Sequence, residues 1–196
     1  MSGRNLLAGV LAGIALFLWG AVSHMVLGID EKIIRNLPGE QATVAVMSEN
    51  IHEAGLYFFP GMSPATSSGT KAEKDAANQA WMQAYATSPH GLVIFSPPTG
   101  PLNFARLMGI ELATDILVGL LAALLLGMAT PVSFGARFAF VALLGLLSWL
   151  AIDVPYWNWY GFPTRFTVVD LVDQVAGFIC AGLVLAAMVK PRARAA

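Results

Sequence analysis

The sequence predicts an all-α membrane protein: a four-transmembrane-helix bundle with a small extracytoplasmic α+β insertion between helices 1 and 2. Charged residues make up 12% of the chain, which is about half of the 25% typical of soluble domains. The shortage is concentrated in four long apolar blocks, and a polar segment at 29–103 separates the first two. Such a pattern is typical of an integral membrane protein.

Each of the four blocks is long and apolar enough to suggest a membrane span, for which about 20 residues are needed. They run from Leu6 to Leu27, Phe104 to Ala129, Arg137 to Asp153 and Thr167 to Val189, and the third is the shortest. The first exceeds the roughly 7–15 apolar residues of a secretory signal, so we expect an uncleaved anchor. The predicted division is transmembrane helix 1 at 1–28, the insertion at 29–103, and helices 2–4 with a short cytoplasmic tail at 104–196.

Basic residues in short loops set the expected orientation, because they favour the cytoplasmic side. With four spans, one side of the membrane carries Arg4, Arg137, Lys190, Arg192 and Arg194. We therefore expect both the N- and C-termini in the cytoplasm of a bacterial cell, in its inner membrane. The segment 29–103 and a loop at 154–166 then lie outside.

The insertion contains predicted elements of both kinds. A helix is expected at 39–55, and two short aromatic and β-branched runs at 55–60 and 91–98 predict strands. A second helix at 70–86 begins with Thr70 followed three residues later by Glu73, which is a capping box. Together they predict a two-stranded ribbon with two helices.

Polar residues in the apolar blocks lie at helical spacing beside small residues. In the last block Asp170, Asp173, Gln174 and Gly177 share a face. The second block has a stripe of Glu111, Asp115, Gly119 and Ala122 or Ala123, and the first has Gly9, Gly13, Phe17, Gly20 and His24. Small residues at such spacing allow helices to pack closely, and Gly9 and Gly13 form a GxxxG pair. The ionisable groups should therefore point at neighbouring helices, within roughly the outer third of the hydrocarbon slab.

Three interpretations of this carboxylate cluster stay open. It is a structural polar network, in which Arg106 and Arg165 form salt bridges to carboxylates and Gln174 takes part. It binds a divalent metal cation, for which the candidate ligands are His24, Glu111, Asp115, Asp170 and Asp173. Or it contains two carboxyls acting as acid and base around a water molecule.

The stretch "IDVPYWNWYGFPTRFTVVD" resembles the C-terminal part of the lipoprotein signal peptidases. The resemblance implies a four-helix inner-membrane aspartic protease, in which Asp153 and Asp170 match the catalytic aspartates and Phe166 matches an aromatic residue before the last span. Thr167 stands where that family has asparagine, and the family's two other motifs are absent. The similar stretch covers about 35 residues, so a membrane aspartic hydrolase enters as an alternative function.

The function expected from the sequence is that of a non-catalytic accessory, assembly or stabilising subunit of a larger membrane complex. No complete catalytic or cofactor motif is present, and glycine-lined helices suit contact with other membrane subunits or self-association within the lipid bilayer. The lone Cys180 excludes an internal disulfide, and the net charge of −1 without a basic stripe gives no indication of nucleic-acid binding. The alternatives are a metal- or proton-binding membrane protein and the hydrolase.

Overall fold

The computed structural model describes residues 2–129 and 133–190. Four of its helical segments are long and apolar enough to cross a membrane. The first combines helix α1 (Gly3–Gly20) with a π-helix, η1 (Ala21–Val26), and the others are α6 (Phe104–Met128), α7 (Phe134–Tyr160) and α8 (Thr164–Met188). The four long apolar helices that the sequence predicts are thus found, in the predicted order, among the described residues.

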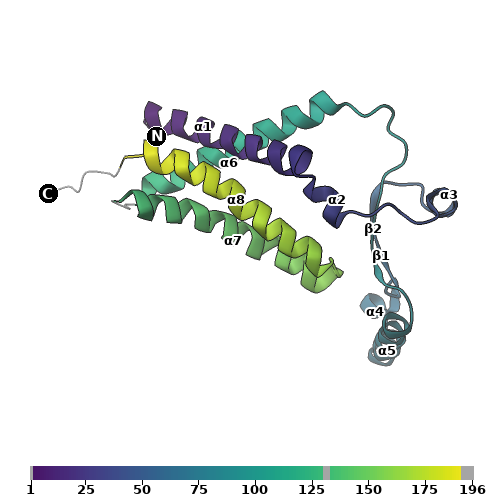
Figure 1. Ribbon diagram of the computed structural model, residues 1–196. Coiled ribbons are helices and arrows are strands. Elements are labelled where there is room, and N and C mark those ends of the chain that lie inside the picture. The colour runs from purple at the N-terminus through teal and green to yellow at the C-terminus, as the bar shows by residue number, and fades with distance from the viewer. Residues whose placement is uncertain (1, 130–132, 191–196) are drawn as a thin grey trace. The chain divides into compact units, whose positions relative to one another are not determined.

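The four long helices form a row more than a closed bundle (Figure 1). Helix α1 packs between α6 and α8, and α7 packs on α8, whereas α6 and α7 have few contacts with each other. In Figure 1, α6 diverges from α7 and α8 toward the end at which α6 begins. We call this the cavity end, and the opposite end, where α1 and α7 begin, the core end.

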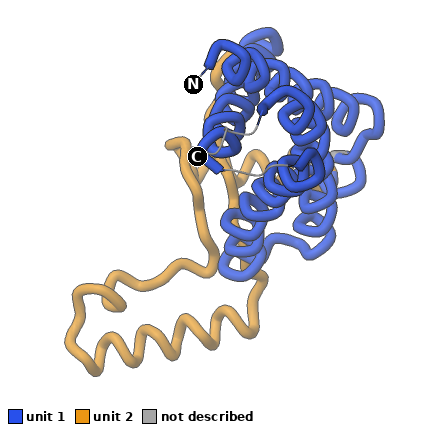
Figure 2. The backbone as a smooth tube through the Cα atoms, turned by 90° about the vertical axis from the view of Figure 1, so that its left-hand side faces the viewer, with its two compact units in different colours: residues 1–35, 102–196 blue, residues 36–101 orange. Residues whose placement is uncertain are grey.

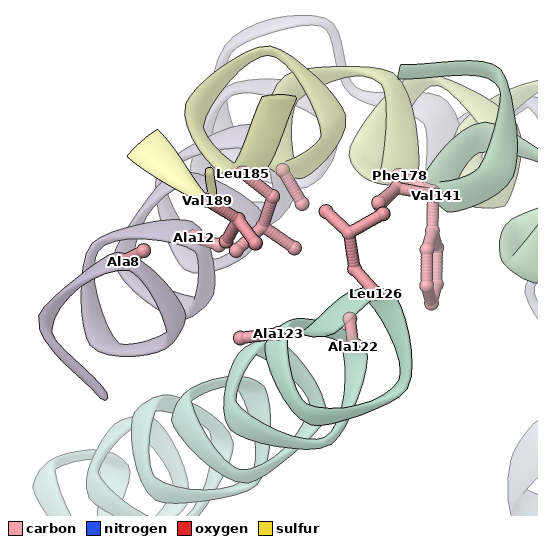
Figure 3. Close-up of a cluster of buried hydrophobic side chains, with 10 residues drawn as sticks. Ala8, Ala12, Ala122, Ala123, Leu126, Val141, Phe178, Leu185 and Val189 are labelled. Atoms are coloured by element: carbon pink, nitrogen blue, oxygen red, sulfur yellow. The ribbon is translucent and has the colours of Figure 1, made fainter. Parts of the chain in front are cut away.

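The hydrophobic core lies at the core end and draws on all four helices (Figure 3). Small side chains let the helices approach closely: a Cβ added to Gly9 would lie 2.8 Å from the backbone Cα of Leu120, and one on Gly13 would meet the backbone of Ile116. The predicted GxxxG contact is therefore confirmed, with α6 as the partner of α1. The buried apolar residues there are Ala8, Ala12, Ala122, Ala123, Leu126, Val141, Phe178, Ala181, Leu185 and Val189.

Helix α7 is longer than the sequence predicts. The third span was expected to end near Asp153 with a loop at 154–166, but the helix continues through Pro155 to Tyr160 and is the longest of the four. Gly161 ends it in the left-handed conformation, with φ 72°. The predicted loop is wrong because a single proline removes one backbone donor but leaves the flanking residues able to stay helical, which membrane helices tolerate.

Residues 36–101 form a second compact unit, the insertion unit, coloured orange in Figure 2. It lies within the predicted 29–103, since the short helix α2 (Ile29–Ile33) belongs to the bundle unit. It contains α3 (Glu40–Asn50), β1 (Gly55–Phe59), α4 (Ala65–Ser68), α5 (Lys71–Thr87) and β2 (Gly91–Phe95). Strands β1 and β2 pair antiparallel, with Leu56 opposite Ile94.

The predicted elements of the insertion unit are found with small shifts. Helix α3 ends five residues before Gly55, and α4 lies in a segment for which no helix is predicted. The capping box is formed: the backbone N–H of Thr70 donates to the Glu73 carboxylate at 2.8 Å, and the Glu73 N–H donates to the Thr70 hydroxyl at 3.4 Å. No residue of 36–101 is buried, so this unit has no hydrophobic core within itself.

Candidate functional site

A cavity of about 620 Å³ lies at the cavity end, among α1, η1, α6 and α8. Helix α1 forms one side, α6 and α8 flank it, and no residue of α7 lines it. Met25 and Phe104 in its lining are 65% and 55% exposed, so the cavity is a groove open to the outside of the bundle. The lining consists of Leu16, Phe17, Trp19, Gly20, Ala21, His24, Met25, Phe104, Met108, Glu111, Asp115, Asp170, Asp173, Gln174 and Gly177.

All five side chains proposed as metal ligands line this one cavity, so the structure brings the three predicted stripes together. They are His24, Glu111, Asp115, Asp170 and Asp173. Within residues 2–129 and 133–190, however, no three His, Cys, Asp or Glu side chains converge closely enough to hold a metal ion. The groups share a cavity without forming a ligand set.

Asp173 is held by two residues of the first span. The indole Nε1–H of Trp19 donates to its Oδ1 at 2.8 Å and to its backbone carbonyl at 3.1 Å. The imidazole Nε2 of His24 lies 3.6 Å from Oδ2, an ion pair when the imidazole is protonated. His24 lies in the π-helix η1, whose wider turn rotates the following residues relative to an α-helix. The first span thus fixes the orientation of Asp173 in the cavity wall.

Asp170 contacts a carboxyl group from another helix. Its carboxyl group lies near enough to that of Asp153 of α7 to interact with it, and Asp173 and His24 also lie within electrostatic reach. The α7–α8 hairpin turns at 161–163, which sets residues 153 and 170 at nearly equal distances from the turn. Two neighbouring carboxyl groups can share one proton, in which case one acts as donor and the other as acceptor.

Gln174 extends the polar wall toward α7, as the predicted network requires. Its Nε2 donates to the hydroxyl of Ser148 at 3.0 Å, and that hydroxyl donates to the Gly145 carbonyl at 2.9 Å. A Cβ added to Gly177, which also lines the cavity, would lie 3.2 Å from the Trp19 ring and 3.3 Å from the Leu16 side chain.

The predicted cationic members of the network do not join it. Arg106 and Arg165 are exposed near the first turns of α6 and α8, and neither forms an ion pair with a described residue. Among the described residues, no lysine or arginine lines the cavity. The lining therefore contains four carboxyl groups. Among its described side chains, His24 is the one that gains positive charge on protonation.

The sequence did not indicate two features of this site. The partnership of Trp19 with Asp173 joins residues 154 positions apart, and nothing in either local pattern links them. The apolar part of the lining comes from Met25, Phe104 and Met108. In the sequence, these residues cannot be distinguished from residues that face lipid. For the first span, the expected helical stripe of Phe17, Gly20 and His24 did indicate the cavity wall, since all three residues line the cavity.

Comparison of the chain with protein-family models, with curated proteins and with solved structures finds no match. Function is therefore inferred from the site.

Proposed function

We propose that this chain is a non-catalytic accessory or assembly subunit of a larger complex in the bacterial inner membrane. The observation that carries the proposal is the open groove at the cavity end, with four carboxyl groups and no lysine or arginine in its lining. Ionisable groups within membrane spans face protein or a watered cavity and pair with one another, because hydrocarbon cannot solvate them. A partner protein that fills such a groove would surround its carboxyl groups with protein instead of hydrocarbon.

The insertion unit gives independent support for a binding role. Leu56 and Ile94 pair across the ribbon and are 68% and 73% exposed. A two-stranded ribbon without a buried core is marginal in isolation, so it gains stability from any surface that covers this apolar pair.

The proposed orientation places the core end at the cytoplasm. Arg4 and Arg137 lie in the first turns of α1 and α7, and Lys190 follows α8, so these three residues mark the same end of the bundle. Arg192 and Arg194 lie outside the described residues. In a chain with Cys180→Ser, labelling of single cysteines introduced at Arg4 and at Glu49, in intact cells against lysed cells, tests this orientation, and labelling of the Arg4 site in intact cells would contradict it.

The subunit proposal is tested by purifying the full chain from its host membrane in a mild detergent. We expect another polypeptide in constant ratio across preparations. Recovery should fall in an Asp173→Asn, Glu111→Gln double variant and stay unchanged in Glu49→Gln, which changes an exposed carboxylate of the insertion unit. Recovery of the lone chain in every preparation would overturn the proposal.

A second function, hydrolysis within the membrane, is favoured by the position of Asp170, whose carboxyl group lies near enough to that of Asp153 to interact with it. Paired carboxyls that share a proton are the acid and base of aspartic proteases, and these two residues match the catalytic pair implied by the resemblance to lipoprotein signal peptidases. The test incubates the chain in liposomes with a host membrane extract and follows the products by mass spectrometry. Products formed by the parent and by Glu111→Gln, but not by Asp153→Asn or Asp170→Asn, are expected of a hydrolase, and identical products from all four would refute it.

A further inference from the structure

We propose that the groove between α6 and α8 receives a transmembrane helix of a partner protein, and that this helix carries a lysine or arginine in the turns level with Asp173. This inference rests on the proposed subunit function and names the chemistry of the partner.

Charge is the first argument. The groove holds four carboxyl groups, namely Glu111, Asp115, Asp170 and Asp173. His24 lies within reach of Asp173, and the carboxyl group of Asp170 lies close to that of Asp153. Glu111 and Asp115, one helical turn apart on α6, have no hydrogen-bond or ion-pair partner among residues 2–129 and 133–190. A cation that enters the groove therefore meets negative charge on both flanking walls.

The size and lining of the groove argue against a bare ion as its occupant. Its volume of about 620 Å³ equals the share of roughly 20 liquid water molecules. Around the carboxyls stand apolar side chains, including Leu16, Phe17, Phe104 and Met108. Such a lining suits a long apolar stem that ends in a positive charge, which is the form of a lysine or arginine side chain. A Cβ added to Gly20, on the α1 side, would meet nothing within 4 Å, so the space beside it is open.

The arrangement of the helices argues for a whole helix and not an isolated side chain. Helices α6 and α7 stand at the two ends of the row and have few contacts, and in Figure 1 they diverge at the cavity end. A further helix laid between α6 and α8 would contact both, at the 8–10 Å axial distance usual for packed helices. Asp173 lies nine residues into α8, roughly 14 Å along its axis. A lysine or arginine at the same depth on a neighbouring helix can reach it with its side chain.

The test uses the full chain in liposomes and a synthetic apolar helix of about 24 residues. One peptide carries a single lysine at the level of Asp173, and matched peptides carry glutamine or leucine there. Association is measured by energy transfer between dyes on peptide and protein. We expect the lysine peptide to associate at least about tenfold more tightly than the other two. The preference should disappear in an Asp173→Asn, Glu111→Gln variant and persist in Glu49→Gln.

A second variant tests whether loss of peptide association could result from loss of the fold. Gly20→Phe places a large side chain in the open space beside α1, so it should block the lysine peptide while all the carboxyls remain. Equal association of the three peptides with the parent chain would overturn the inference. Competition by dodecyltrimethylammonium at concentrations that leave the leucine peptide unaffected would also overturn it, because the groove would then be a site for small organic cations. If the peptides fail but a polypeptide is still recovered from host membranes, the partner binds elsewhere and the subunit function stands.

Discussion

Trp19 of the first span and Asp173 of the last are joined by two hydrogen bonds from one indole N–H, at 2.8 Å to the carboxylate and 3.1 Å to the backbone carbonyl. The bonds tie α1 to α8 at the edge of the cavity. Because the acceptor is an ionisable group in a poorly solvated place, the contact matters both for packing and for the direction in which the carboxylate points.

Trp19→Phe should remove these bonds while keeping most of the aromatic volume. Loss of a hydrogen bond to a charged group costs about 1.5–3 kcal/mol, and we expect a decrease in unfolding free energy of that size. The measurement is an SDS titration in mixed micelles followed by circular dichroism. Trp159→Phe is the matched control, since Trp159 is 74% exposed and no hydrogen bond of its indole with a described residue is present. Equal losses in the two variants would show that aromatic packing, and not the bond to Asp173, is responsible.

The crossing of α1 and α6 depends on the absence of a side chain at Gly13. A Cβ there would meet backbone atoms of Asp115 and Ile116, which cannot move aside as a flexible side chain can. Gly13→Ala should therefore destabilise the bundle by about 1–3 kcal/mol, as overpacking does. Gly109→Ala, in α6, meets nothing within 4 Å and should gain up to about 1 kcal/mol from better helix propensity. The same titration checks both, and a stable Gly13→Ala would mean that α1 and α6 do not cross at this point.

The sequence carries enough information for the parts of the site that depend on local periodicity. Helical spacing predicted that Gly9 and Gly13 form a close contact, which the structure shows, and that His24, Asp115 and Asp173 share one region, where they line the cavity. Depth along each helix follows from its rise per residue, so the common level of these groups could also be predicted.

Three features depend on tertiary packing and could not be predicted from the local pattern. Arg106 was a candidate salt-bridge partner for the carboxylates in the structural interpretation, yet it stays exposed at the start of α6. The continuation of α7 past Pro155 depends on the packing and capping of its last turns. The weak contact between α6 and α7 depends on how α1 lies between α6 and α8, which no single helix encodes.

The capping box of α5 makes a pH prediction for a helix that is not one of the four candidate spans. The hydrogen bond from the Thr70 hydroxyl, and then that from its backbone N–H, hold the pKa of Glu73 below its ordinary value of 4.5. A group whose pKa is lowered by folding stabilises the folded state above its unfolded pKa, and this contribution is lost as the pH falls through the folded pKa. The first turn of α5 should therefore fray below pH 4.5.

Amide hydrogen exchange at the first turn of α5 measures this effect. Glu73→Gln should already show faster exchange at neutral pH and a weaker dependence on acid. Asp75→Asn is the control on the same helix, because Asp75 has no hydrogen bond with a described residue. If exchange in the parent chain is unchanged between neutral pH and pH values well below 4.5, the carboxylate does not hold the cap.

Gly161 joins α7 to α8 in a conformation that side chains resist. Its φ of 72° lies in the left-handed region, and a residue with a Cβ pays about 1–2 kcal/mol there. No atom lies within 4 Å of the added Cβ, so the cost of Gly161→Ala should come from the backbone alone. Gly161→Asn should cost less, since asparagine tolerates this region better than other residues, and Gly135→Ala, in an open helical position, should cost nothing.

Because this turn also sets Asp153 opposite Asp170, the alanine variant should weaken the carboxyl pair together with the fold, which infrared spectroscopy of the protonated carboxyl can follow. Loss of stability in Gly161→Asn equal to that in Gly161→Ala would argue that the turn requires flexibility and not a left-handed residue.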